Sequence, residues 1–208
     1  MSQRTLWTAA LWLAVILVVV GQWYQHREDQ PEQTLNRIDG VTVFPTPLSV
    51  SDFNFINQYG DAVTQADLLG RWQLVFFGFT FCPDICPTTL ADLSRSYRQL
   101  SAADQAQWHV VLVSIDPERD TPEMLQPYMQ YFNSEFIALT GNPEALPTLA
   151  SELNAFYARA ERPDGMAYLM DHSANLALID PQGRYRGFIE PPHDAARMVP
   201  ILETVLKL

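Results

Sequence analysis

Two cysteines and one histidine are the side chains of this sequence best suited to bind a soft metal ion or to exchange disulfides. Cys82 and Cys86 are the only cysteines among 208 residues, and three residues separate them. They follow an apolar run and precede a helical pattern, so we expect them at the carboxyl edge of a sheet, where open α/β folds place their sites. Pro87 favours a first helical turn. Cys86 is therefore predicted near a helix N-terminus, which stabilises a thiolate.

The C-x3-C spacing leaves three interpretations of the cysteine pair open. Thioredoxin-type redox pairs have two intervening residues, and the longer loop can either close as a redox disulfide or let two thiolates hold one metal ion. A purely structural disulfide would stabilise little, because the ring that it closes is short. With two cysteines, a multi-bridge scaffold and a four-cysteine zinc site within one chain are excluded.

His172 is the candidate third ligand among four histidines. It directly follows a segment, 158–171, that lacks periodicity and is expected to form a long loop able to reach the cysteines. Two thiolates and one imidazole form a soft donor set that suits copper in either oxidation state and excludes hard ions such as magnesium. Asp171 or a nearby carbonyl is expected to orient the other imidazole nitrogen. An ordinary loop histidine is the alternative interpretation.

Alternating apolar and helical patterns are expected to position these residues. They predict βαβ units and a mixed sheet, and an α/β fold that ends on a hairpin and a helix, which is the thioredoxin arrangement. Strands are predicted at 53–56, 62–64, 72–79, 110–115, 136–140, 176–179 and 185–189, and helices over 90–100 and after Thr121, Pro143 and Asp194.

The N-terminal segment predicts a transmembrane helix. Leu6–Tyr24 contains 19 residues without a charge, which span roughly 28 Å as a helix. A cleaved signal peptide is the alternative, although no small-x-small cleavage pattern follows. Arg4 and the amino terminus favour an N-terminus inside, which places residues 25–208 outside a bacterial inner membrane, in the periplasm. Thiols there tend to be oxidised unless they are reduced or ligated.

Three parts are expected along the chain: an anchor over 1–24, a polar tether over 25–47 that contains Pro45 and Pro47, and a thioredoxin-like domain over 48–208. The sequence is 48% hydrophobic, enough for a sizeable core, and its formal charge is −11. Because no basic cluster offsets that charge, a nucleic-acid partner is not expected.

Two further groups of residues are interpreted as structural. The acidic segment 116–123 is expected to be a strand end and helix cap with solvated charges rather than a hard-metal site. Scattered methionines, mostly at core spacing, are expected to pack rather than bind copper. They are Met124, Met129, Met166, Met170 and Met198.

Three segments together carry a specific pattern: Gly78–Leu90 with both cysteines, Ser114–Glu123, and Asp171–Gly183 with His172. Through these segments the chain resembles the Sco/SenC family of membrane-anchored, thioredoxin-like copper proteins, and the resemblance covers about residues 48–207. The resemblance implies copper binding by Cys82, Cys86 and His172. It also implies delivery of copper to the binuclear centre of cytochrome c oxidase subunit II, alone or with its assembly factors, or upkeep of that centre's cysteines.

We therefore expect a metallochaperone, a binding and transfer protein rather than an enzyme. The alternative is a thiol–disulfide oxidoreductase in which Cys82 attacks and Cys86 resolves. A thiol peroxidase fits poorly, because its cysteine needs a nearby arginine and none lies close in sequence.

Overall fold

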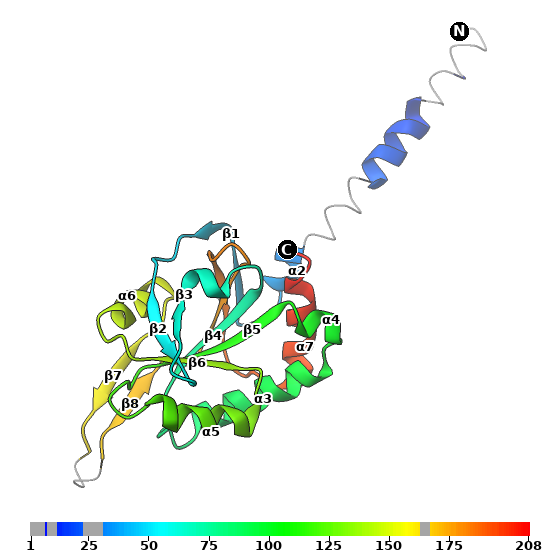
Figure 1. Cartoon of the computed structure of the whole chain (residues 1–208). Coiled ribbons are helices and arrows are strands. Elements are labelled where there is room, and N and C mark those ends of the chain that lie inside the picture. Colours follow the sequence, from blue (N-terminus) through cyan, green and yellow to red (C-terminus); the bar gives the residue numbers. More distant parts are fainter. Residues whose placement is uncertain (1–6, 8–11, 23–30, 163–166) are drawn as a thin grey trace.

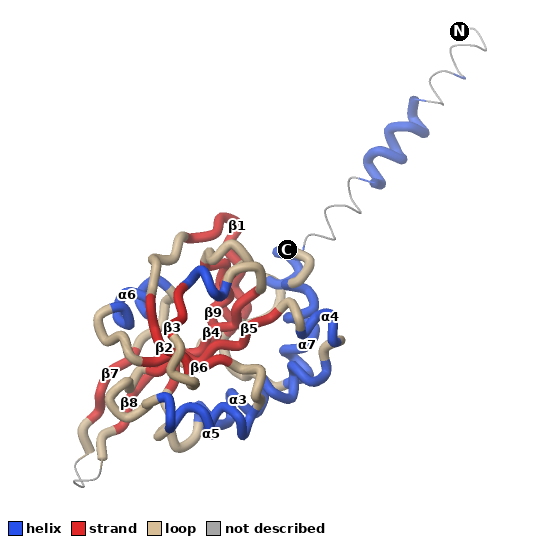
Figure 2. The backbone as a smooth tube through the Cα atoms, viewed as in Figure 1, coloured by secondary structure: helices blue, strands red, loops and turns tan. Residues whose placement is uncertain are grey.

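The computed structural model of the chain describes residue 7 and residues 12–22, 31–162 and 167–208. An eight-stranded mixed sheet lies at its centre with helices around it (Figures 1 and 2). The strands of this sheet are β1 (Val41–Leu48), β2 (Asn54–Asn57), β3 (Ala62–Thr64), β4 (Trp72–Gly78), β5 (Trp108–Ser114), β6 (Ile137–Thr140), β9 (Leu176–Ile179) and β10 (Tyr185–Ile189). The helices are α2 (Pro31–Leu35), α3 (Ile85–Gln99), α4 (Ala102–Gln105), α5 (Pro122–Phe132), α6 (Ala145–Glu152) and α7 (Ala195–Val205), with a 3-10 turn at Gln65–Leu68.

The strand order is β1-β10-β9-β4-β5-β6-β2-β3. Strands β4, β5 and β6 are parallel, and the other pairs are antiparallel. All seven residues of β4 are buried, as expected for a central strand covered on both faces. On one face, Leu149 of α6 lies opposite Val75 and Val111; on the other, Gly78 packs against the Cys86 side chain of α3. The predicted mixed α/β sheet is confirmed.

Residues 31–47 differ from the expected tether. Helix α2 buries Leu35 completely, and β1 buries Val41 and Val43 while pairing with β10. Pro45 and Pro47, which favoured a tether in the sequence, lie within β1. Because β1 is an edge strand, a proline there removes no hydrogen bond from the interior of the sheet. This part of the predicted tether therefore belongs to the folded domain, and residues 25–30 lie outside the described residues.

The long loop expected over 158–171 contains a hairpin instead. Strand β7 (Tyr157–Ala160) pairs with β8 (Leu169–His172) in a two-stranded sheet separate from the main one. Each strand has four residues, mostly half-buried, so neither shows the apolar alternation that marks a strand in sequence. His172 consequently ends a strand rather than a loop.

Residue 7 and residues 12–22 of the predicted anchor are helical, and their side chains are exposed. Over the ranges given above, no helix combines the length and the apolarity needed to cross a membrane. The rest of the predicted anchor lies outside the described residues.

Candidate metal centre

The fold brings Cys82, Cys86 and His172 together, although the histidine lies far from the cysteines in sequence. The His172 Nε2 atom is 3.3 Å from the Cys86 Sγ atom and 4.0 Å from the Cys82 Sγ atom. The three ligand atoms lie within 4.8 Å of one another, and in the described part of the chain this is the one group of three or more His, Cys, Asp or Glu side chains placed to share a metal ion. The three residues predicted from sequence therefore form one cluster.

The cysteine loop joins the buried end of β4 to the N-terminus of α3. Asp84 is the residue before this helix, but its side chain accepts no capping hydrogen bond. The Cys86 backbone N–H instead donates to the Cys82 Sγ atom over 3.3 Å. The sulfur of Cys82 thus serves as the acceptor that free N–H groups at a helix N-terminus require. Cys86 itself is fully buried, whereas Cys82 is half-buried.

The surroundings shift the pKa values of the two thiols in opposite directions. Hydrogen bonding from the Cys86 side chain, together with contacts to His172 and to backbone N–H groups of the first helical turn, lowers the pKa of Cys82 to about 4 against the opposing effect of burial. The hydrogen bond to Cys82, reinforced by burial, raises the pKa of Cys86 above its usual range. The pair therefore holds one thiolate on Cys82 and one proton on Cys86 at neutral pH, and a bound cation would displace that proton.

The backbone fixes the tautomer of His172. Its Nδ1 atom lies 2.9 Å from the Ser173 carbonyl oxygen, which can only accept a hydrogen bond, so Nδ1 carries the proton. The other ring nitrogen, Nε2, then faces both sulfurs. Edge-on contacts of the ring with Phe76 and Phe79, at 5.8 and 5.9 Å between centroids, hold its plane. The predicted orienting carbonyl is thus confirmed, and Asp171 is exposed.

Two carboxylates beside the cysteine loop were misjudged from sequence as solvated. Asp116 and Asp120 are 3% and 0% exposed. Asp120 accepts hydrogen bonds from Thr80 N and Oγ1 and from Ser114 Oγ, although burial still raises its pKa. The prediction holds for Glu118, which is exposed. The sequence of an acidic segment does not show which of its carboxylates point inward. No signal in the sequence therefore distinguishes the buried Asp116 and Asp120 from the exposed Glu118.

Arg119 was also missed, because it is distant from the cysteines in sequence. Its guanidinium lies 4.9 Å from the ring centre of Phe81, which immediately precedes Cys82. Its Nε atom pairs with Asp116, and its Nη1 atom donates to the Tyr168 carbonyl. An arginine is therefore near the cysteine loop after all; these bonds occupy its Nε and Nη1 atoms, whereas its buried Nη2 atom has no hydrogen-bond partner among the described residues.

Among the residues that the structure describes, the other histidines and the methionines lie outside the cluster. His109 is half-buried in β5, and His193 is buried beside the Ile189 carbonyl. Met129 and Met198 are buried, which confirms their predicted packing role. Of the other three methionines predicted to pack, Met124 is exposed, Met170 packs partly against the core, and Met166 lies outside the described residues.

The comparisons with known proteins agree with this geometry. A family model described as SCO1/SenC matches residues 45–207. The chain belongs to the SCO1/SenC family. A Stutzerimonas stutzeri protein named "Putative copper-binding protein" is 41% identical over 152 residues, which are 73% of this chain and 74% of that protein. The predicted family is confirmed.

Two solved SCO1/SenC structures extend the comparison to the fold. The crystal structure of Arabidopsis thaliana ScoI with copper bound has a TM-score of 0.70 and 31% identity, covering 76% of this chain and 99% of that one. The apo Sco1 solution structure from Thermus thermophilus has a TM-score of 0.69 and 34% identity, covering 81% and 96%. The predicted thioredoxin-like α/β fold is confirmed as that of the SCO1/SenC family.

The donor set fits copper on chemical grounds. Metal–ligand bonds of about 2.0 Å to nitrogen and 2.3 Å to sulfur, as in zinc sites, place ligand atoms that share a metal ~3–4 Å apart. The separations of His172 Nε2 from the two sulfurs lie in this range. Two thiolates and an imidazole prefer copper to hard cations.

Proposed function

We propose that this chain is a copper metallochaperone in which Cys82, Cys86 and His172 hold the ion. The observation that carries the proposal is the convergence of two sulfurs and one imidazole nitrogen within 4.8 Å of one another. The copper bound to Arabidopsis thaliana ScoI supports the choice of metal.

Transfer by stepwise ligand exchange is consistent with the unequal burial of the ligands. Cys86 is fully buried, whereas Cys82 is accessible and His172 is half-buried on a strand outside the main sheet. An incoming ligand replaces Cys82 or His172 first, while Cys86 keeps the ion bound. Since both cysteines must be reduced to bind, metal loading depends on their redox state.

The proposed recipient is cytochrome c oxidase subunit II, at its binuclear copper centre, or an assembly factor of that subunit. The support is the family membership and the sequence resemblance described above. We further propose that residues 6–24 anchor the chain in a bacterial inner membrane with the domain in the periplasm, on the basis of their length and lack of charge. Protease added to intact spheroplasts should digest the domain; its protection there would contradict this orientation.

Copper titration of the reduced protein tests the proposed site. Wild type should bind one copper ion with a sulfur-to-copper charge-transfer spectrum, and His172→Ala should bind it at least about tenfold more weakly, because one of three ligands is lost. His109→Gln is the matched control, since this half-buried histidine lies outside the cluster, and its affinity should equal that of wild type. Unchanged affinity in His172→Ala would remove the histidine from the site.

The cysteine geometry also supports a second function, thiol–disulfide exchange. The Cys82 thiolate would attack a partner disulfide, form a mixed disulfide and release one partner thiolate. Cys86 would lose its proton and attack the Cys82 sulfur, which releases the second partner thiol and leaves a Cys82–Cys86 disulfide. The accessible, low-pKa Cys82 and the buried Cys86 match the attacking and resolving roles.

Trapping of a mixed disulfide distinguishes thiol–disulfide exchange from metal transfer. In Cys86→Ser the resolving thiol is absent, so a mixed disulfide between Cys82 and the partner should accumulate on non-reducing gels. Cys82→Ser is the matched control and should trap nothing, because the remaining thiol is buried. Absence of a trapped species with the oxidised copper-site domain of subunit II as partner would argue against the exchange.

A further inference from the structure

We propose that Arg119 is a positioning residue of the metal centre, one that couples the cysteine loop to the hairpin carrying His172. This inference rests on the proposed copper site and adds a residue that does not touch the metal. According to this inference, the protein binds copper tightly only when Arg119 holds the His172 imidazole over the two sulfurs.

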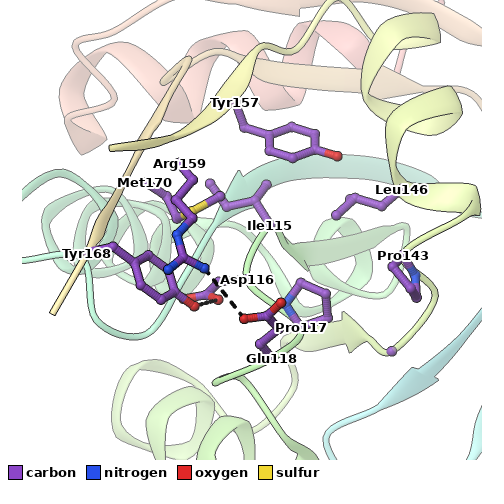
Figure 3. Close-up of a pocket in the computed structure, with 11 residues that line it drawn as sticks. Ile115, Asp116, Pro117, Glu118, Pro143, Leu146, Tyr157, Arg159, Tyr168 and Met170 are labelled. Carbon is purple, nitrogen blue, oxygen red and sulfur yellow. Dashed lines mark hydrogen bonds and ion pairs between the residues drawn. The ribbon is translucent and has the colours of Figure 1, made fainter. Parts of the chain in front are cut away.

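The hairpin needs such support because the main sheet does not hold it. Strands β7 and β8 pair only with each other, and a two-stranded hairpin alone is at best marginally stable in water. A cavity of about 390 Å³ also lies beside the inner face of the hairpin, lined by Tyr157 and Met170 of the hairpin and by Ile115 and Leu146 of the domain (Figure 3). Core packing along this face is therefore incomplete.

Arg119 and Asp116 bind the hairpin next to this cavity. The Arg119 guanidinium stacks on the Tyr168 ring at 3.7 Å from its centre, and Nη1 donates to the Tyr168 carbonyl over 3.0 Å. Asp116 accepts from both the Arg119 Nε atom and the Tyr168 hydroxyl, the latter over 2.7 Å. Tyr168 lies one residue before β8, so these contacts fix the strand that ends at His172.

The same guanidinium contacts the cysteine loop. It lies 4.9 Å from the ring centre of Phe81 and 5.9 Å from that of Phe79, whose ring in turn contacts His172. The next residue of the same segment, Asp120, binds both the backbone and the side chain of Thr80. One short segment after β5 therefore holds the loop that carries the sulfurs and the strand that carries the nitrogen.

A lysine cannot replace this arginine. The contacts need a planar cation that stacks on a ring while donating from two different nitrogens, and an ammonium group offers neither the plane nor the fork. The Arg119 and Asp116 side chains are 17% and 3% exposed, so water screens their interaction little. Arg119→Lys therefore keeps the positive charge but loses the planar group that stacks on Tyr168 and the two separate donor nitrogens.

Arg159 provides the matched control. Its guanidinium also stacks on Tyr168 at 3.7 Å, but it is half-exposed and pairs with Glu118 and Glu161 rather than with the cysteine loop. We expect Arg119→Lys to weaken copper binding by the reduced full-length protein roughly tenfold, and Arg159→Lys to change it less than about twofold. Competition with a chelator of known copper affinity measures the copper affinity of each variant.

A double-mutant cycle decides whether Arg119 acts through His172. In the His172→Ala background, Arg119→Lys should weaken binding no further, because there is no imidazole left to position. Electron paramagnetic resonance of the Cu(II) form should show nitrogen coupling in wild type and Arg159→Lys, and reduced coupling in Arg119→Lys. A tenfold loss in both backgrounds, or full nitrogen coupling in Arg119→Lys, would overturn the inference.

The failure of the proposed function would look different. In that case wild type would not bind copper, or His172→Ala would bind it as wild type does. If thermal unfolding shows that Arg119→Lys does not fold, Tyr168→Leu replaces it, because this change removes the stacking surface and leaves Arg119 in place. In the double-mutant cycle, Tyr168→Leu should weaken copper binding in the wild-type background and weaken it no further in the His172→Ala background. An equal loss in both backgrounds would overturn the inference.

Discussion

Cys82 and Cys86 are identical in chemistry and differ only in their surroundings. The sulfur of Cys82 accepts a backbone N–H at the start of α3, and that of Cys86 lies in the core between α3 and the sheet. Charge and access therefore distinguish the two thiols, and the lowered pKa belongs to Cys82 rather than to Cys86, for which the sequence predicted a stabilised thiolate.

The reactivity of Cys82 should persist in acid. Its lowered pKa, about 4, keeps the thiolate populated at every pH above that value, whereas an ordinary thiol loses about tenfold in rate for each pH unit below its pKa of ~8.5. Alkylation of reduced protein by iodoacetamide, located by mass spectrometry, should stay nearly constant at Cys82 from pH 8 to pH 6. In urea the profile should return to that of an ordinary thiol. A tenfold fall per pH unit in the folded protein would contradict the lowered pKa.

Gly78 should tolerate no side chain. A Cβ atom at this position would lie 2.8 Å from the Phe76 ring, 3.0 Å from the Cys86 Sγ atom and 3.1 Å from Leu112. All three neighbours are buried, so they have little room to move. Gly78→Ala should destabilise the fold by about 1–3 kcal/mol in urea unfolding and should weaken copper binding by displacing Cys86. Wild-type affinity in this variant would show that the sulfur adjusts.

The donor atoms themselves were predictable from residue type and motif, but the residues around them were not. Cys82, Cys86 and His172 carry chemistry that few other side chains share. Asp116 and Arg119 are ordinary surface residue types, and their roles arise from contacts with Tyr168 that only the folded chain brings together.

At the scale of elements, long apolar runs were predictable and short, half-covered strands were not. β4 and β5 are buried along their length, so their sequences are almost entirely apolar. β1 contains two prolines and exposed positions, and β7 and β8 have four residues each. In such strands, contacts made elsewhere in the fold outweigh local propensity.

Helix α2 should contribute to the stability of the domain. Leu35 is fully buried, and Glu32 pairs with Arg186 of β10. Leu35→Ala should lower the free energy of unfolding by about 2–5 kcal/mol, as measured in urea. Copper affinity should not change, because α2 contributes nothing to the ligand cluster, which makes this variant a control for Gly78→Ala. If residues 31–47 were a tether, Leu35→Ala would leave the unfolding free energy unaltered.

For the whole molecule, the metal centre joins parts of the chain that are far apart in sequence. A ligand that binds only the native arrangement stabilises it, by about 2.7 kcal/mol at a free concentration of 100 Kd. Cu(I) should therefore raise the Tm of the reduced protein, and a copper chelator should reverse the rise. Oxidation with diamide, which links Cys82 to Cys86, should abolish the effect. An equal rise in Cys82→Ser would place the binding elsewhere.

The main sheet ends on β1 at one side and on β3 at the other. Pro45 and Pro47 deprive β1 of two amide donors, and β3 is only three residues long. Neither border offers the long, regular row of amides and carbonyls on which a foreign strand can grow. The main sheet is thereby a poor template for strand-mediated aggregation between copies of this domain, and the two prolines contribute to this as well as to its shape.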